Sequence, residues 1–418
     1  MLKYLHILCV TLLMHLPLAE ALTLYTGSNT QNLTAPDSSR EAIFNAVASV
    51  CDADGANRSG SAVYLRDKFI LTANHIALRS HVTFDGITYW ERDTNFTPIQ
   101  IGSADLRILK LLENPGLTPI ELQTPETGQD VSYLDGKGRN AAIVDVMGTI
   151  VGWGKGSAED GNGFIAGNNH LWTWSGNYAK RWGTNTIDSS YPINSSASYN
   201  YTYNSLVTDL DTNAGIDEAA LAAHDSGAAL FIENDGVWRL AGIASLVQRE
   251  GASYFSSSGG DRNYFVRISI LASSIEAAIP DSSLYSGWQT NYNLSGVNTE
   301  PTADSDGDGI PQLLEFAFGG DPNKNDCTIL PTQQFVTDRK DSYLELQVIR
   351  PIGIQGIAYT PQTTSDLNNW PSDATGIDTI SPTAVDNGNG TETLTFRRSQ
   401  PLADTGQAFI RVLVNTVP

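Results

Sequence analysis

A histidine, an aspartate and a serine occur in three separate stretches, each beside an apolar run. His75 ends Leu71-Thr72-Ala73-Asn74-His75, Asp105 precedes the apolar-rich residues 106–111, and Ser226 lies in His224-Asp225-Ser226-Gly227. A serine hydroxyl is a weak nucleophile until a neighbouring imidazole accepts its proton, and a carboxylate fixes the tautomer of that imidazole. The three residue types therefore predict acyl transfer through a serine.

Each signal has an ordinary explanation when it is taken alone, since Asp-Ser-Gly is a common turn and an aspartate ahead of a strand is usually a turn residue. The choice of base is narrow, however. His81 lies in a polar stretch that predicts a surface position, and His170 lies in a Gly/Asn-rich loop with no acid nearby in sequence. His75 follows an apolar strand and a short turn, which favours it as the general base.

The elements that must position these residues are short strands. From about residue 60 to 279, β-rich runs alternate with Gly, Asn, Ser and Asp, which predicts a barrel or a sandwich. Residues 266–279 have apolar positions near helical spacing and predict a closing helix. A polar linker is expected at 281–302, and β-type alternation predicts a small terminal β domain at 327–418.

The order and context of the three residues resemble the trypsin/chymotrypsin-like serine peptidases. Thr72-Ala73-Asn74-His75 is similar to that family's Thr-Ala-Ala-His motif, residues 105–110 to its Asp-Leu-Ala-Leu-Leu segment, and Gly152-Trp153-Gly154 to its Gly-Trp-Gly turn. The strands at 238–245 and 264–268 match as well. The resemblance covers residues 59–279, within an expected protease domain at 22–280 that has an N-terminal extension at 22–58.

The resemblance implies two six-stranded β-barrels and a C-terminal helix. With the terminal β domain, expected to be sandwich-like, and a calcium-loop linker before it, which is argued below, the fold class expected for the whole chain is all-β. The triad would lie between the barrels. His75 would be the base and then the acid, Asp105 would orient it, and Ser226 would form an acyl-enzyme. Ser245 would help to hold Asp105 and would offer backbone hydrogen bonds to an extended peptide.

The nucleophile motif departs from the family's Gly-Asp-Ser-Gly-Gly at both ends, with His224 first and Ala228 last. The resemblance assigns the oxyanion hole to the amides of His224 and Ser226. A Cβ at the first position can rotate its peptide, and loss of one oxyanion donor costs about 10² to 10³ in rate. His224 therefore indicates a slower enzyme, an imidazole beside the hole, or a degenerate protease.

A second departure concerns activation. In members that mature from zymogens, a new N-terminal amine pairs with the acid before the nucleophile, which is Asp225 here. Residues 22–59 contain no basic residue followed by an Ile-Val-Gly-Gly-like start. Either an internal group holds Asp225, or the enzyme is active without cleavage.

The specificity pocket is assigned by loose alignment only. Ala220 is expected near the floor, and Val247 and Asn263 near the walls. An uncharged floor disfavours Lys or Arg as the preferred substrate residue, and such walls favour small or modest side chains.

An acidic loop runs from Asp304 to Glu315. Asp304, Asp306, Asp308 and Glu315 stand at loop positions one, three, five and twelve, with Gly309 at position six, and this spacing predicts a Ca²⁺ site. The alternative is a solvated acidic linker. The segment 303–326 resembles the calcium loops of dockerin and thrombospondin type 3 repeats, and a single loop predicts a structural ion.

The first 21 residues predict a secretory signal peptide, because Lys3 precedes an apolar run that ends in Ala19-Glu20-Ala21. That run is too short for a membrane span. With 46 acidic and 25 basic residues the net charge is −21, which disfavours nucleic acid as a partner. Cys51 and Cys327, which remain after signal removal, either pair or stay as free thiols.

Together these features predict a secreted serine endopeptidase that acts on proteins or peptides. Two alternatives stay open. The chain can be an inactive homologue that binds protein through the same cleft, or an adhesin whose C-terminal domain contacts a cell surface or matrix.

Overall fold

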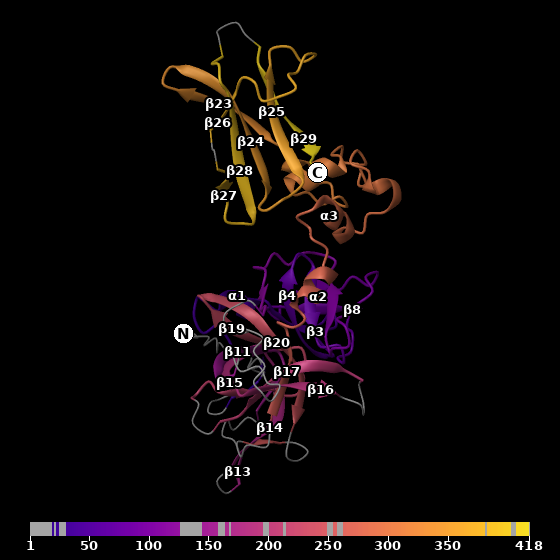
Figure 1. Cartoon of the computed structure of the whole chain (residues 1–418), viewed down its shortest axis with the longest axis vertical. Helices are drawn as coiled ribbons and strands as arrows, with labels where there is room; N and C mark the ends of the chain where they lie inside the picture. The colour runs from indigo at the N-terminus through magenta and orange to yellow at the C-terminus, as the bar shows by residue number, and fades with distance from the viewer. Residues whose placement is uncertain are drawn as a thin grey trace, which may run out of the picture. The chain divides into compact units, whose positions relative to one another are not determined.

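The computed structural model describes residues 19–20, 22–24, 31–125, 144–157, 164–166, 169–194, 200–211, 215–248, 254–256, 262–380, 383–402 and 407–417. Its contacts divide the chain into two compact units, Met1–Ile279 and Pro280–Pro418 (Figure 1). The predicted signal peptide lies almost wholly outside the described residues, as does the side chain of His170.

The first sheet of the N-terminal unit has seven strands in the order β7-β6-β3-β4-β5-β9-β8. These strands are β3 (Val47–Cys51), β4 (Gly60–Arg66), β5 (Phe69–Thr72), β6 (His81–Thr83), β7 (Trp90–Glu91), β8 (Ile99–Gln100) and β9 (Arg107–Lys110). All residues of β3, β5 and β9 are buried, so these strands are covered on both faces. Helix α1 (Glu41–Asn45) leads into β3.

The second sheet has eight strands, of which seven follow the order β15-β11-β19-β20-β22-β17-β16 and β10 adds to β20 in parallel. The strands are β10 (Glu121–Leu122), β11 (Val146–Gly152), β15 (Arg181–Ile187), β16 (Ser189–Asn194), β17 (Thr202–Asp209), β19 (Ala229–Asn234), β20 (Val237–Gln248) and β22 (Arg262–Arg267). Their buried Ile, Leu and Phe side chains form the core of this half.

Helix α2 (Ala272–Ala278) closes the N-terminal unit, and it is shorter than the helix predicted over 266–279. Val266 lies in β22 instead, where it pairs with Ser205 of β17 and Ile243 of β20. A β-branched residue packs well on such a sheet. The helix begins only where the chain leaves the sheet.

Several short ladders flank the two sheets. A third sheet joins β1 (Ala19–Glu20), β12 (Lys155–Ser157), β13 (Phe164–Ala166), β14 (Asn169–Tyr178) and β21 (Tyr254–Ser256). Strand β2 (Thr23–Leu24) pairs with β18 (Ala219–Ala220), six residues before the nucleophile. This pairing places residues 23–24 beside the segment that carries the candidate serine.

The C-terminal unit begins with α3 (Tyr285–Asn291), a 3₁₀ turn η3 (Gly296–Thr299) and α4 (Gln312–Phe318). The stretch predicted as a linker therefore holds a helix. Trp288 of α3 is buried and its ring lies 5.7 Å from that of Phe316 in α4, while Tyr285 lies 5.3 Å from Phe316. These aromatic contacts explain why a polar-looking segment is ordered.

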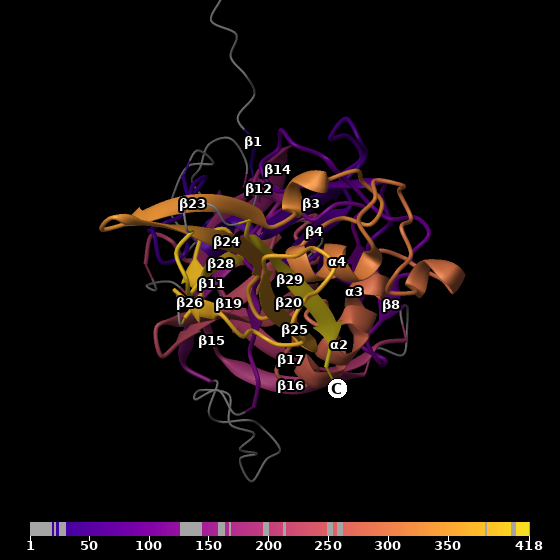
Figure 2. The same ribbon diagram turned by 90° about the horizontal axis from the view of Figure 1, so that it is seen from above.

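After the 3₁₀ turn η4 (Cys327–Ile329), the rest of this unit is β structure. The strands are β23 (Thr332–Asp338), β24 (Asp341–Pro351), β25 (Ile357–Thr364), β26 (Ile377–Thr379), β27 (Val385–Asp386), β28 (Thr391–Arg398) and β29 (Phe409–Thr416). One sheet has the order β23-β24-β28-β26 with β27 on β28, and β25 pairs with β29 (Figure 2). Leu346, Phe396 and Ile410 lie in the core that the two sheets share.

The predicted all-β class is confirmed: the described residues are mainly strand, with two curled sheets, a closing helix and a C-terminal β region. The two sheets have seven and eight strands where six each were predicted, and the count includes two-residue strands such as β7, β8 and β10. Cys51 is buried, Cys327 is exposed, and both thiols are free. Among the described residues, no helix is both long and apolar enough to cross a membrane.

Candidate active site

The loops that leave β5, precede β9 and precede β19 bring His75, Asp105 and Ser226 together. His75 Nε2 lies 2.8 Å from Ser226 Oγ, and His75 Nδ1 lies 2.6 Å from Asp105 Oδ2. The backbone N–H of His75 also donates to Asp105 Oδ1 at 2.9 Å. Asp105 thus holds both the ring and the main chain of His75, and the ring can accept the serine proton at Nε2.

Asp105 is almost fully buried, with 1% of its surface exposed, and Ser245 completes its surroundings. Ser245 Oγ donates to Asp105 Oδ2 at 2.5 Å, as the resemblance implied. Tyr203, in β17, donates from its hydroxyl to Ser245 Oγ at 2.8 Å. A chain of hydrogen bonds therefore runs from β17 through β20 to the carboxylate that orients His75.

The loop that carries His75 is fixed on both sides of the histidine. Asn74 Nδ2 donates to the hydroxyl oxygen of Tyr201 at 3.0 Å. The buried Arg107 guanidinium donates to the carbonyl oxygen of Ile76. Burial lowers the pKa of Arg107, while Tyr201 and Asp105 act in the opposite direction. Asn74, where the family has alanine, therefore has a structural partner of its own.

Ser226 lies in a turn that only a glycine could follow. Gly227 has φ +88°, and a Cβ at this position would lie 2.0 Å from the carbonyl oxygen of Ser61. Its amide donates to Ala244 O at 2.8 Å, and Ser226 O accepts from the Ser61 amide at 2.8 Å. The turn is thus bonded to both β4 and β20, and the serine side chain is left beside His75.

Asp225 is buried on the opposite side of this turn. Its carboxylate accepts from the amides of Gly154 at 2.7 Å and Ala222 at 2.8 Å, and also from the amide of Leu22. A Cβ on Gly152 or Gly154 would lie 2.3 Å or 2.6 Å from this carboxylate, which explains both glycines of Gly-Trp-Gly.

The hydrogen bonds from these amides do not fully compensate the Asp225 carboxylate for its lost hydration. Burial raises its pKa to about 7, although Arg181 acts in the opposite direction. One of the groups that hold Asp225 is the main chain of Leu22, the first residue after the predicted signal peptide.

His224, Asp225 and Ser226 follow one another in the turn, and their backbone amides differ in whether they have an acceptor. Asp225 N bonds to Ala222 O, whereas the other two amides have no acceptor among the described residues. His224 has φ +71°, in the left-handed region that favours glycine. The residue therefore keeps a glycine-like backbone despite its Cβ, at a conformational cost of about 1–2 kcal/mol.

The His224 ring packs edge-on against Tyr178, with 5.0 Å between ring centroids. Burial lowers its pKa, the nearby Lys155 lowers it further, and a hydrogen bond with the Arg58 backbone opposes them. The ring beside the candidate oxyanion hole is therefore mostly neutral at pH 7. Its contact with Tyr178 helps to offset the strained backbone.

The residues predicted to bind substrate fall into two groups. Ser245 forms a bulge, since Ala244 pairs with Phe265 and Leu246 pairs with Tyr264 in the β20–β22 ladder. Val247 is partly exposed two residues further on. Among the described residues, this end of β20 pairs only with β22, and no strand is paired with its other edge there.

Ala220 and Asn263 are both fully buried. Asn263 accepts from the Leu221 amide at 2.9 Å and donates to Thr208 Oγ1 at 3.0 Å. Its amide is thus used within the protein, so Asn263 anchors the segment after Ala220 and does not face an open pocket wall. The loose alignment could not distinguish these roles, because they depend on which face of β22 carries the residue.

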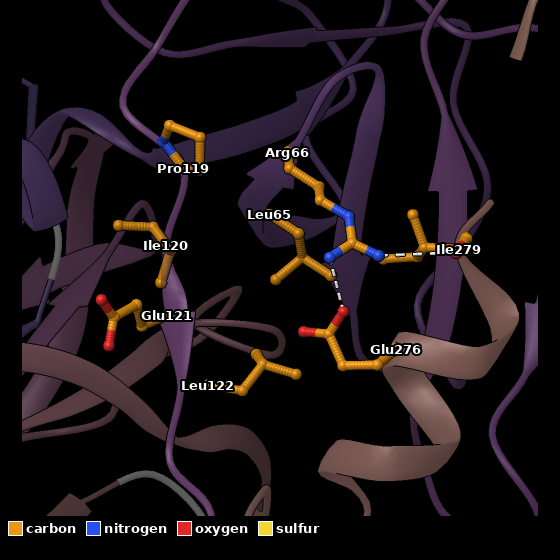
Figure 3. A pocket seen from close by; sticks show the side chains of 8 residues that line it. All are labelled: Leu65, Arg66, Pro119, Ile120, Glu121, Leu122, Glu276 and Ile279. Carbon is orange, nitrogen blue, oxygen red and sulfur yellow. Dashed lines mark hydrogen bonds and ion pairs between the residues drawn. The ribbon is translucent and has the colours of Figure 1, made fainter. Parts of the chain in front are cut away.

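A separate small pocket of about 200 Å³ lies between β4, β10 and α2 (Figure 3). Arg66 lies on the side of the pocket formed by α2, with its guanidinium 2.6 Å from the Glu276 carboxylate (Figure 3). Leu65, Ile120 and Leu122 supply apolar walls. None of the three catalytic candidates lines this pocket.

In the C-terminal unit, the acidic loop curls as its spacing predicted. Asp304 accepts from the amides of Gly307 at 2.8 Å and Gly309 at 2.9 Å, and both glycines have positive φ. Carboxylate oxygens of Asp304, Asp306 and Asp308 lie within 4.8 Å of one another. Two oxygens on one Ca²⁺ lie at most about 5 Å apart, so one ion can contact all three.

A second group in the same loop joins Asp308, Glu315 and Asp326 within 4.8 Å. Glu315 is fully buried, yet neither carboxylate oxygen has a hydrogen-bond partner among the described residues. Burial, and then the charges of Asp306 and Asp326, raise its pKa to about 8. Paired buried oxygens without donors fit a bound cation. The sequence prediction did not include Asp326, which lies outside the twelve-residue loop.

Sequence reasoning also missed Tyr203, Tyr201 and Ser61. Each bonds to the site across a long stretch of chain and has no distinctive neighbours in sequence. The family resemblance pointed to Ser245 as a partner of Asp105, but it did not point to the tyrosine behind Ser245.

No protein-family model matches the chain, and no curated protein matches it. Two solved structures are similar to it: "neuropsin, a serine protease expressed in the limbic system of mouse brain" and "human heparin binding protein". Each is 14% identical and covers 56% of this chain. The first has a TM-score of 0.36 over 94% of its own length, and the second has a TM-score of 0.35 over 91%.

Proposed function

We propose that this chain is a secreted serine endopeptidase that hydrolyses peptide bonds through an acyl-enzyme on Ser226. The observation that carries this proposal is the continuous line of hydrogen bonds from Ser226 through His75 to Asp105, at 2.8 Å and 2.6 Å. A structural histidine seldom lies between an accessible hydroxyl and a buried carboxylate in this way.

The chemistry follows from these positions. His75 Nε2 takes the Ser226 proton as Oγ attacks the scissile carbonyl, and the amides of His224 and Ser226 stabilise the resulting oxyanion. His75 then donates that proton to the leaving amine, which leaves an ester on Ser226. Water, deprotonated by His75, releases the acid and regenerates the serine.

The substrate would bind as an extended peptide along the free edge of β20 next to Ser245. The expectation of an uncharged side chain at the cleaved position rests on the alignment that predicts Ala220 near the pocket floor. An inactive homologue would have the same fold, so the proposal requires a chemical test of the serine.

The test is covalent labelling with a fluorophosphonate, which reacts only with an activated serine. We expect an adduct on the intact chain that maps to Ser226 and is lost in Ser226→Ala and His75→Ala. The matched control is Ser103→Ala, which removes an exposed hydroxyl that bonds to Thr202 O outside the triad. If neither the parent chain nor the Ser103→Ala control is labelled, the result favours the inactive homologue that binds protein.

We also propose that residues 304–326 bind one structural Ca²⁺ through Asp304, Asp306, Asp308 and Glu315, with Asp326 as a further ligand. The buried, unpartnered oxygens of Glu315 support this proposal. Calorimetry with CaCl₂ should show that Asp306→Ala and Glu315→Gln lose one bound ion. Asp338→Asn, which changes an exposed carboxylate in β23, should bind calcium normally. Equal heats for all four proteins would overturn the proposal.

The third possibility, an adhesin, makes the C-terminal unit the main functional part. Its strand β23 is almost entirely exposed, including Phe335, which is 74% exposed. We assign this unit a supporting role in surface or matrix contact. Binding of the intact Ser226→Ala chain to cells, compared with a Phe335→Ser version, would measure that contact without interference from proteolysis.

A further inference from the structure

Two basic side chains lie beside the nucleophile turn, in a chain whose net charge is −21. The guanidinium carbon of Arg58 lies 5.9 Å from the centre of the Tyr178 ring, and the ammonium of Lys155 lies 5.7 Å from it. The His224 ring packs against the same tyrosine, with 5.0 Å between ring centroids. Both positive charges therefore lie close to the residue whose amide belongs to the candidate oxyanion hole.

The main chain ties both basic residues to this turn. The amide of Lys155 donates to Ala223 O at 2.8 Å, and the His224 ring forms a hydrogen bond with the Arg58 backbone. The guanidinium of Arg58 also lies 5.1 Å from the centre of the Trp153 ring. Stacking on aromatic rings restricts the positions that a guanidinium can adopt. The two basic groups thus belong to the framework around the nucleophile.

Neither basic side chain forms an ion pair with a carboxylate in the part of the chain that the structure describes. Arg58 Nη1 is buried, and it has no hydrogen-bond acceptor among the described residues. The acids of the same loop bond elsewhere: Asp52 accepts from Asn57 Nδ2 at 2.8 Å. Asp54 accepts from the Ala56 amide at 2.9 Å. A guanidinium can donate two parallel bonds to one carboxylate, so a carboxylate ligand fits this position.

The turn of Ser226 lies between two strands, and this decides which part of a peptide would meet Arg58. On one side the Gly227 amide donates to Ala244 O in β20, and on the other the Ser61 amide in β4 donates to Ser226 O. Under the proposed function, the part of the substrate that becomes the acyl group lies along β20. The part that leaves therefore continues on the side of β4, where the chain enters from Arg58.

The distance along the chain is short enough for contact. Arg58 lies two residues before Gly60, the first residue of β4, and a Cβ on Gly60 would lie 2.6 Å from Ser226 O. Two residues span at most about 7 Å, and each residue of an extended peptide advances about 3.3 Å. The Arg58 side chain can therefore reach one of the first two residues after the scissile bond.

We propose that Arg58 and Lys155 bind a carboxylate in the leaving part of the substrate, within the first two residues after the cleaved bond; the inference rests on the proposed peptidase function. The carboxylate belongs either to an acidic side chain or to the C-terminus of the peptide. The first source makes the chain selective for acidic stretches of a protein, and the second makes it release short C-terminal fragments. His224 contributes through its ring, which holds the Arg58 backbone.

The decisive experiment measures acyl transfer, because this reaction isolates binding of the leaving part. An N-blocked alanine p-nitrophenyl ester acylates Ser226, and dipeptide acceptors then compete with water for the acyl-enzyme. His75 takes a proton from the acceptor amine and returns it to Ser226 Oγ, as an amide bond replaces the ester. The ratio of transfer to hydrolysis reports how well each acceptor is bound.

Two pairs of acceptors distinguish the sources of the carboxylate. Ala-Glu-amide is compared with Ala-Gln-amide for a side chain, and Ala-Ala with Ala-Ala-amide for a C-terminus. In one pair we expect the acid to be transferred about tenfold better than its amide, which is the size of one charge-assisted hydrogen bond. The preference should shrink as salt is added. Equal transfer to acid and amide in both pairs would overturn the site.

Variants of the parent chain then assign the preference to its residues. Arg58→Gln should abolish the difference between acid and amide, and Lys155→Gln should reduce it. The matched control is Arg40→Gln, which removes another guanidinium stacked on an aromatic ring, 4.9 Å from the centre of Trp238, and should keep the full preference. The rate of fluorophosphonate labelling reports whether each variant is folded. A labelled Arg58→Gln chain with an unchanged preference would overturn the role of Arg58.

Fluorophosphonate labelling also separates failure of this inference from failure of the proposed function. A labelled parent chain that transfers acid and amide equally well is a peptidase without the carboxylate site. If the parent is not labelled, the same dipeptides are titrated into the Ser226→Ala chain, and the amide NMR shifts of Arg58 and Lys155 are followed. Larger shifts with an acid than with its amide would support the carboxylate site in a binding homologue, and equal shifts would overturn it.

Discussion

At the residue scale, His224 determines how well the candidate oxyanion hole is formed. Its φ of +71° keeps the peptide in the conformation that glycine would adopt, so the Cβ adds strain but does not turn the amide away. The ring contributes packing against Tyr178 and, with a lowered pKa, little positive charge. Histidine at position 224, where the family motif has glycine, therefore affects stability more than it affects the position of the backbone amide that would donate to the oxyanion.

This view predicts that His224→Gly is more stable than His224→Ala. Both variants lose the contact with Tyr178, but only alanine keeps a Cβ in the left-handed region, so glycine should gain about 1 kcal/mol. Urea unfolding in the Ser226→Ala background measures the difference. Alanine at least as stable as glycine would contradict the backbone strain. Fluorophosphonate should still label a His224→Gly chain that retains Ser226.

What the sequence predicted at this scale follows from local signals. His75, Asp105 and Ser226 each stand at a strand end in a recognisable stretch, and the structure brings all three together. Tyr203 lacks such a stretch, because its role depends on Ser245, which lies 42 residues away in sequence. Asn263 was predicted near a pocket wall, but its contacts depend on which face of β22 carries it.

At the element scale, β17 and β20 act as one support for Asp105. The hydroxyl of Tyr203 in β17 donates to Ser245, which sits at the bulge in β20 and donates to the carboxylate. A bulge lets one residue leave the regular ladder and turn its side chain inward. The sequence predicted the role of Ser245, but the bulge itself depends on the register between β20 and β22.

We predict that Tyr203→Phe lowers kcat/KM by about fivefold, because one hydrogen bond contributes about 1 kcal/mol. The loss should appear mainly in kcat, since Tyr203 acts through Ser245 on the orientation of His75. Tyr264→Phe is a matched control, as its hydroxyl bonds to Gln248 and not to the triad chain. Steady-state kinetics on a peptide substrate compares the two variants. An equal loss of kcat/KM in both would indicate a general effect on packing.

At the scale of the whole chain, residues 22–24 contact the segment that carries Asp225, although the two are about 200 residues apart in sequence. Strand β2 pairs with β18, the Leu22 side chain is 1% exposed in the core of the second barrel, and its amide donates to the Asp225 carboxylate. Removal of a signal peptide after Ala21 would convert that amide into a charged amine at the same position. Cleavage of the signal peptide during export would then be sufficient to give the Asp225 carboxylate a charged partner.

This idea predicts how pH affects two forms of the chain, one beginning at Ala21 and one beginning at Leu22. In the longer form the pKa of Asp225 rises from 3.8 unfolded to about 7 folded, so the folded chain retains a proton that the unfolded chain has lost. The free energy of unfolding should therefore fall as pH rises from about 4 to about 7. In the shorter form the ammonium stabilises the carboxylate, which lowers this pKa and reduces the decline.

The difference between the two forms should be largest near pH 7 and should shrink as the Leu22 amine loses its proton, above its ordinary pKa of about 7.7–8.0. Other acids with raised pKa values, such as Glu218, are common to both forms and cancel. Asp225→Asn should remove the difference, because the amine then has no carboxylate to pair with. Urea unfolding across this pH range measures the difference, and N-terminal sequencing of each purified form identifies its first residue. Two forms with parallel pH profiles would show that the Leu22 amine does not reach Asp225, and that the main-chain contact alone positions the turn before Ser226.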